Sequence, residues 1–136
     1  MSATQNLAYA AIQVAHNFGA VAVAGGSLAA VRFRSMDTRR KLAWLALAGW
    51  GTQAVSGAAF GAVSYYFYHR FPDISGVATT ALEIKMACVA IGFLLLAAYL
   101  FRSNNWGMAR MNTLWIASSA LAVTALASAA FLRWFS

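Results

Sequence analysis

The chain consists of four long apolar stretches separated by short polar connections. The stretches cover approximately residues 7–31, 42–68, 76–101 and 113–131. Because a helix rises about 1.5 Å per residue, about 20 apolar residues cross a hydrocarbon layer of about 30 Å. The short alternating segments that are typical of membrane β-barrels do not occur in the sequence. The pattern therefore predicts an all-α integral membrane protein with four transmembrane helices.

The connections between these stretches predict how the helices are arranged. They cover residues 32–41, 69–75 and 102–112. Short connections make successive helices antiparallel, so we expect an up-down-up-down bundle that forms one domain over residues 1–136. The first stretch follows MSATQN, which has no basic residue, and it is longer than the apolar core of a signal peptide. We therefore expect it to be a permanent span.

The composition agrees with a membrane protein and argues against a soluble one. Of the 136 residues, 62% are apolar and 10% are charged, whereas soluble domains carry about 25% charged residues. An isoelectric point near 10.4 would otherwise suggest a nucleic acid partner. The Lys and Arg residues are sparse and lie between the apolar stretches, where lipid head groups would be. We therefore expect the lipid bilayer, and no nucleic acid, as the partner.

Basic residues are distributed unequally between the two faces of the predicted bundle. Seven accompany the first and third connections: Arg32, Arg34, Arg39, Arg40, Lys41, Arg102 and Arg110. The opposite face carries only Arg70 and Arg133, and Lys85 lies inside a stretch. The positive-inside rule then places the seven in the cytoplasm and both termini in the periplasm. This orientation corresponds to a multi-pass protein of the inner (plasma) membrane.

Small residues recur along the first two stretches and predict close helix packing. On the first stretch such residues recur at steps of three or four: Ala11, Ala15, Gly19, Ala22 and Gly26. On the second stretch a set recurs at every fourth position: Gly49, Gln53, Gly57 and Gly61. Small side chains let helix backbones approach closely in a membrane. A strict four-residue step drifts by about 40° at each step, so the second set winds around its helix. We expect these glycines to pack helices rather than to line a ligand slot.

His16 is the most informative polar residue within the apolar stretches. It lies nine residues into the first stretch, about 13 Å from its start. A polar side chain at this depth needs a partner, because an unsatisfied polar group in hydrocarbon costs several kcal/mol. Haem iron, copper or a quinone would each satisfy it, as would a hydrogen bond to Thr52 or Gln53 of the second stretch.

Three further residues complete the candidate set in the outer half of the bundle. His69 ends the second stretch and is either a second ligand drawn inward or an interfacial histidine beside Arg70. Glu83 and Lys85 lie seven and nine residues into the third stretch, at a depth similar to that of His16. Charged residues inside a membrane usually face the bundle interior and have partners. The alternative is that Glu83 lies at the interface and Lys85 extends toward it.

Other residue types offer little chemistry. Met86 is conceivable as a second haem ligand beside His16, although a lone methionine inside a membrane is more often packing filler. Cys88 has no second cysteine and no disulfide partner, so we expect an inert core residue. Phosphate-binding glycine loops, catalytic Ser-His-Asp sets and CxxCH haem-attachment motifs do not occur. A stand-alone enzyme is therefore not expected, and two histidines suffice for at most one bis-histidine haem.

The segment IQVAHNFGAVAVAGGSLAAV, with His16, Gly19 and the pair Gly25-Gly26, resembles the first helix of CopD-like copper-resistance domains and HemJ-type protoporphyrinogen oxidases. The resemblance covers about 20 of the 136 residues. Val23 and Ala24 precede the glycine pair where those families have a tryptophan. The resemblance implies haem or copper near His16.

These expectations combine into one preferred function and two alternatives. We expect a small electron-transfer subunit that binds b-type haem or quinone near the periplasmic side, beside a periplasmic redox partner. His16 and His69 are the candidate ligands, and Glu83 and Lys85 the candidate cofactor-binding charges. The first alternative is a non-catalytic accessory or anchor subunit of a larger membrane complex or homo-oligomer. The second is a copper or small-solute permease.

Overall fold

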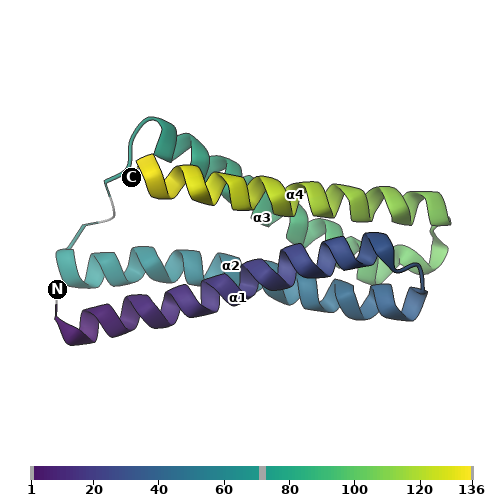
Figure 1. The fold of residues 1–136 in the computed structure, drawn as a ribbon, viewed down its shortest axis with the longest axis horizontal. Coiled ribbons are helices and arrows are strands. Elements are labelled where there is room, and N and C mark those ends of the chain that lie inside the picture. Colours follow the sequence, from purple (N-terminus) through teal and green to yellow (C-terminus); the bar gives the residue numbers. More distant parts are fainter. Residues whose placement is uncertain (1, 71–72, 136) are drawn as a thin grey trace.

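The computed structural model describes residues 2–70 and 73–135, and nearly all of them are helical (Figure 1). The elements are α1 (Ala3–Arg32), α2 (Met36–Tyr68), α3 (Val77–Arg102), the short 3-10 turn η1 (Ser103–Asn105) and α4 (Met108–Phe135). The predicted all-α chain with four long helices is confirmed. Residues 36–41 and 108–112 were expected in connections but are helical, because α2 and α4 begin with polar turns outside the apolar stretches. Of the predicted connection 69–75, residues 71 and 72 lie outside the described residues.

The four helices form two antiparallel pairs, α1 with α2 and α3 with α4 (Figure 1). The pairs pack against each other at the end that holds residues 33–35 and η1, which we call the arginine end. They diverge at the opposite end, where α1 begins and α4 ends, which we call the terminal end. The bundle therefore has a closed half and an open half.

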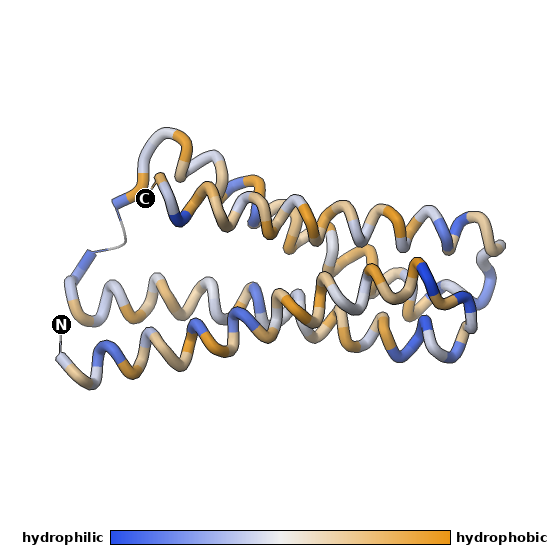
Figure 2. Tube along the Cα trace, in the orientation of Figure 1, coloured by the Kyte–Doolittle hydropathy of each residue, from blue (hydrophilic) through white to orange (hydrophobic). Residues whose placement is uncertain are grey.

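Three of the helices are long and apolar enough to cross a membrane: α1, α4, and α3 together with η1. Hydrophobic residues extend along the helices, and hydrophilic residues lie both at the arginine end and at several positions of the open half (Figure 2). The 33-residue α2 is not among the three. Its central residues include Gly49, Thr52, Gln53 and Ser56, which lower its hydropathy. Several of these polar groups bind α1 or the backbone of α2 itself.

Close approach of the backbones holds α1 against α2. A methyl group on Gly19 would lie 3.1 Å from the carbonyl oxygen of Gly49, and one on Gly49 would lie 2.8 Å from the carbonyl oxygen of Gly19. The predicted packing role of these two glycines is confirmed. Gly57 is different, because nothing lies within 4 Å of the position of a methyl group there. Two steps of four residues have rotated Gly57 away from α1, so the prediction was wrong for this residue.

The core of the closed half is built from aromatic residues. The fully buried Trp50 of α2 packs on Gly92 of α3, where a methyl group would overlap the indole ring. Tyr99 of α3 and Trp115 of α4 meet edge to face with their ring centroids 5.2 Å apart. Such pairs stabilise a core beyond the area that they bury. The aromatic cluster therefore joins α2 to the α3–α4 pair.

Polar contacts complete the closed half. Ser27 of α1 and Ser118 of α4 are both buried, and their hydroxyl oxygens lie 2.8 Å apart. Arg39 is only 1% exposed, although its sequence position suggested an exposed connection. Its Nε donates to the carbonyl oxygens of Ala30 and Phe33 at 3.0 and 2.9 Å, and its Nη2 donates to Oδ1 of Asn112 at 2.8 Å. One guanidinium thus ties the end of α1 and the start of α2 to α4.

Candidate functional site

The structure brings two of the predicted site residues together across the bundle. Nζ of Lys85 lies 2.8 Å from Nε2 of His16. The two residues are 69 positions apart in the sequence and belong to different helix pairs, His16 to α1 and Lys85 to α3. Both side chains are half-buried. The contact therefore joins the two pairs at the margin of the open half.

The second ring nitrogen of His16 defines which tautomer the site requires. Nδ1 lies 2.7 Å from Oγ of Ser56, and the same Oγ donates to the carbonyl oxygen of Thr52 at 2.5 Å. A serine hydroxyl has a single proton to donate, so toward Nδ1 it acts as acceptor. Nδ1 of His16 therefore carries the hydrogen, and Nε2 presents its lone pair to the Lys85 ammonium. The hydrogen bonds assign a neutral imidazole whose Nε2 faces away from α2.

Neighbouring side chains hold this ring in place. The side-chain amide of Gln53 donates to the carbonyl oxygen of His16 at 2.5 Å, and the ring of Phe60 meets the imidazole edge to face at 5.9 Å. Gln53 and Ser56 are three residues apart, so they lie on the same face of α2. The sequence suggested Gln53 or Thr52 as a ring partner, but the ring binds Ser56 one turn further along, and Gln53 binds the backbone instead. Ser56 is the site residue that the sequence analysis missed.

Lys85 has no carboxylate partner in the described part of the chain. Glu83, two residues earlier on α3, is exposed and points to a different side of the helix. Among residues 2–70 and 73–135 the one salt bridge joins Lys41 and Asp37. An ammonium carries three N–H donors, and the contact with His16 uses one of them. Lys85 therefore retains donor capacity for a further acceptor.

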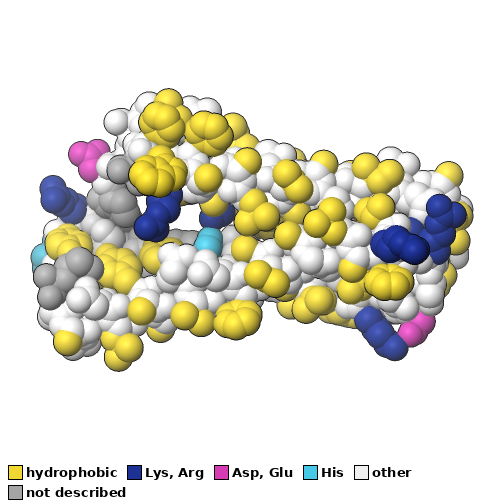
Figure 3. All heavy atoms as spheres, viewed as in Figure 1, with side chains coloured by type: hydrophobic (Ala, Val, Ile, Leu, Met, Phe, Trp, Pro, Cys, Tyr) yellow, Lys and Arg dark blue, Asp and Glu magenta, His cyan; other side chains and the backbone are white. Residues whose placement is uncertain are grey.

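The molecule is hollowed between the two helix pairs that this contact joins. Figure 3 shows an opening between the α1–α2 pair and the α3–α4 pair in the open half, bordered by His and Lys/Arg side chains. The helices on either side of it diverge toward the terminal end (Figure 1). The ammonium of Lys85 and the imidazole of His16 face each other across the two helix pairs, so a ligand that enters between the pairs at this level would meet both groups. The His16–Lys85 pair is therefore the candidate functional site.

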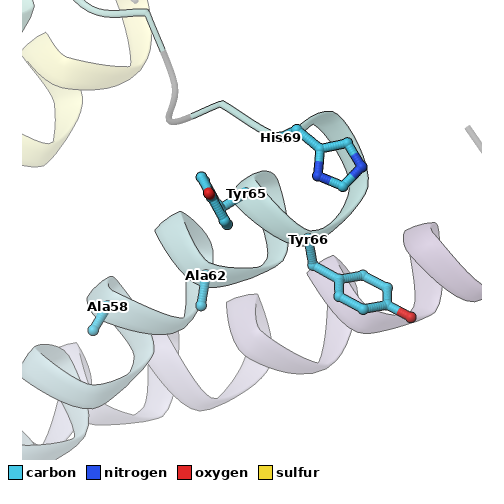
Figure 4. Close-up of a pocket in the computed structure, with 5 residues that line it drawn as sticks. All are labelled: Ala58, Ala62, Tyr65, Tyr66 and His69. Carbon is cyan, nitrogen blue, oxygen red and sulfur yellow. The ribbon is translucent and has the colours of Figure 1, made fainter.

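His69 lies apart from this pair. It ends α2 in the left-handed backbone conformation, with φ of 52°, and its N–H donates to the carbonyl oxygen of Tyr65. It is nine residues beyond Phe60, which corresponds to about 13 Å along the helix from the level of His16. With Tyr65 and Tyr66 it lines a shallow depression on the outside of α2 (Figure 4). The structure thus gives His69 a role in ending the helix.

The other candidates also lie away from the site. Met86 is 63% exposed and faces outward, so it is not placed beside His16. Cys88 is a buried free thiol in the core, as expected. Within residues 2–70 and 73–135, no three His, Cys, Asp or Glu side chains are grouped in a way that could hold a metal ion. A metal at this site would have to rely on His16 and on ligands from a cofactor or another chain.

Comparison with protein-family models, curated proteins and solved structures gives no match for this chain. The similarity of the first helix to CopD-like and HemJ-type proteins therefore stays a prediction.

Proposed function

We propose that this protein is a small membrane-embedded electron-transfer subunit and that it binds b-type haem with His16 as an axial ligand. The proposal is supported by one observation: the hydrogen bond to Ser56 leaves Nε2 of His16 unprotonated, with its lone pair directed at Lys85. A neutral imidazole with this orientation is the form that binds iron.

The membrane placement that we propose includes all four helices. The 33-residue α2 is long enough to span the membrane, and it packs against α1, which is also apolar enough to do so. Its polar groups bind within the bundle, which makes them tolerable in hydrocarbon. The excess of arginines at the arginine end supports a cytoplasmic position for that end. The open half and both termini would then face the periplasm across the inner membrane.

The residues around His16 match what a haem ligand requires. Metal-binding histidines generally donate their other N–H to an acceptor that sets the ring orientation, and Ser56 provides that acceptor. Haem also carries two propionates, and Lys85 is a cation without a carboxylate partner among the described residues. Bound haem would supply a one-electron carrier. The chain would contribute the ligand, its orientation and the positive charge beside it.

Each residue of the site has a defined task in this proposal. Ser56 holds Nδ1 of His16 protonated, so that Nε2 is the nitrogen available for binding. Lys85 occupies Nε2 in the absence of a ligand and would pair with a propionate in its presence. His69 lies about 13 Å further along α2 and is not needed. A second axial ligand would come from another chain, which fits a subunit of a larger assembly.

A membrane quinone is the second candidate ligand of the same site. The Lys85 ammonium donates hydrogen bonds and Nε2 of His16 accepts them, and these atoms lie 2.8 Å apart. A quinol hydroxyl needs both functions, because its oxygen accepts one hydrogen bond and its proton is donated in another. The opening between the helix pairs would admit such a ligand from the side (Figure 3). Quinone therefore remains the alternative to haem in an electron-transfer role.

A reduced-minus-oxidised absorbance spectrum of the purified protein tests this proposal. The protein is expressed with ample haem supply and isolated in mild detergent, and its lipid extract is analysed for quinone. We expect a haem α-band in the wild type and its loss in His16→Ala, with the band retained in His69→Ala. A spectrum without haem together with stoichiometric quinone would favour the second candidate. Neither cofactor in a correctly folded protein would refute an electron-transfer role and support an accessory subunit.

A further inference from the structure

Five exposed arginines form a rim around the arginine end of the bundle. They are Arg32, Arg34, Arg40, Arg102 and Arg110. Three of them flank the connection between α1 and α2, and two flank the connection between α3 and α4, which lies at the same end (Figure 1). Lys and Arg side chains gather visibly at this end in Figure 3. We call these five residues the arginine rim.

The rim has almost no counter-charge within the described part of the chain. Asp37 is the single acidic residue at this end, and its carboxylate lies 2.6 Å from Nζ of Lys41. None of the five arginines forms a salt bridge with a residue of 2–70 or 73–135. Like charges gathered on one surface create a potential that attracts anions. The anions that neutralise the rim must therefore come from outside the described chain.

Apolar side chains alternate with the arginines along the rim. Phe33 lies between two of them in the sequence, and Phe101, which is 83% exposed, precedes Arg102. The guanidinium of Arg110 stacks over the ring of Trp106, 4.2 Å from its centroid. A small soluble anion would gain nothing from exposed apolar residues at this level. A ligand with a charged head and a hydrocarbon body would contact both kinds of side chain.

The buried Arg39 gives this rim a rigid base. Its guanidinium binds the carbonyl oxygens of Ala30 and Phe33 and the side chain of Asn112. Three rim residues are close in sequence to residues that Arg39 binds. Arg32 and Arg34 adjoin Phe33, and Arg110 is two residues before Asn112. Their backbone positions are therefore held relative to one another by a single side chain. A rigid arrangement of donors binds a ligand at a smaller entropic cost than a mobile one.

We propose that the arginine rim is a binding site for the phosphate head groups of anionic phospholipids. Arginine presents a planar set of donors that matches phosphate in a bidentate way, and the rim contains arginine alone. The interleaved aromatic and apolar side chains contact the glycerol and upper acyl region of the same lipid. The site is independent of the His16–Lys85 pair, which lies toward the open half. It retains specific lipids at the closed end of the bundle.

Native mass spectrometry of the full-length, delipidated protein in detergent tests this proposal. Phosphatidylglycerol or phosphatidylcholine of the same chain length is added, and the bound lipids are counted. An arginine near an anionic lipid surface contributes roughly a fivefold gain in binding. We expect phosphatidylglycerol to bind at least tenfold more tightly, and Arg34→Gln/Arg102→Gln/Arg110→Gln to lose this preference. The matched control Arg70→Gln/Arg133→Gln removes charge from the terminal end and should retain it.

Several results would overturn the proposal. These are equal binding of the two lipids, an equal loss in the control variant, or complete displacement of phosphatidylglycerol by inorganic phosphate. The last result would identify a soluble phosphate compound as the ligand. If the triple variant does not fold, the single variants Arg34→Gln and Arg102→Gln are measured instead. Each should weaken phosphatidylglycerol binding roughly fivefold, and unchanged binding in both refutes the site.

Discussion

Replacing Arg39 by methionine tests how the closed half of the bundle is held together. Methionine fills part of the same volume but removes every donor of the guanidinium. The carbonyl oxygens of Ala30 and Phe33 and the side-chain oxygen of Asn112 would lose the partners that now lie 2.8–3.0 Å away. Because Arg39 is 1% exposed, water cannot replace the lost donors without opening the structure. We therefore expect a clear loss of stability.

The expected magnitude follows from two opposing terms. A hydrogen bond to a charged group contributes about 1.5–3 kcal/mol. The N–H of Nε is shared by two carbonyl oxygens and one N–H of Nη2 binds Asn112, so the upper limit is several kcal/mol. The variant also removes the desolvation cost of a buried guanidinium, which offsets part of this loss. No acidic partner is left unpaired, because Arg39 binds neutral groups only, namely these three oxygens and the sulfur of Met108. We expect the free energy of unfolding to fall by about 3 kcal/mol.

Reversible unfolding in mixed micelles, with increasing mole fraction of SDS and helix content as the signal, measures this change. The neighbouring Arg40→Met is the matched control, because Arg40 is exposed and carries the same charge. Its free energy of unfolding should change by less than about 0.5 kcal/mol. If the Arg39 and Arg40 variants lose the same stability, the guanidinium bonds do not hold the helix ends, and the reasoning is refuted.

Two further predictions concern the α1–α2 pair. Gly49→Ala should reduce the free energy of unfolding by about 2 kcal/mol in the same assay, because its methyl group would crowd the facing backbone of α1. Gly57→Ala should be neutral or stabilising by about 0.5 kcal/mol, because the space there is open; equal effects of the two variants would contradict the packing. Ser56→Ala should raise the midpoint potential of the proposed haem in a redox titration, because Nδ1–H of His16 loses its acceptor and the imidazole donates less charge to iron. An unchanged potential would contradict the orienting role of Ser56.

The fold was predictable from the sequence to a considerable extent, because membrane-spanning helices obey a length and polarity rule. The helix number and the antiparallel order followed from four apolar stretches and short connections. The polar first turns of α2 and α4 were not predictable from the same rule. Residues such as Asp37 and Lys41 are too polar for hydrocarbon, yet a helix can begin outside the membrane. Hydropathy reports which segment enters the lipid, and it does not report where the helix starts.

The sequence predicted the level of the site residues within the bundle, but not which way their side chains point. His16 and Lys85 lie at similar distances from the starts of their stretches, so a shared level in the bundle could be inferred. Their direct contact depends on how α3 is rotated about its axis, which its nearly uniform apolar surface does not encode. Ser56 was missed for a related reason, since a serine inside an apolar helix normally binds its own backbone. Only the close α1–α2 packing brings its oxygen to the imidazole.

The burial of Arg39 could not be predicted by counting basic residues at each end of the bundle. The sequence placed seven basic residues together at one end of the bundle, and five of the arginines are exposed there. Arg39 stands in the same run, RSMDTRRK, but it lies on the face of α2 that points into the bundle. Its burial follows from the unexpected helical start of α2, because a loop would not have given it a fixed face. The error in the helix boundary and the error in this residue's role therefore have one cause.

Haem content per chain, determined by the pyridine haemochrome assay on purified protein, tests the central claim most directly. The wild type and His69→Ala are predicted to contain haem in the same ratio to protein, and His16→Ala is predicted to contain none while it stays folded and monodisperse. Loss of haem in His69→Ala, or full haem content in His16→Ala, would contradict the assignment of the site to the imidazole of His16.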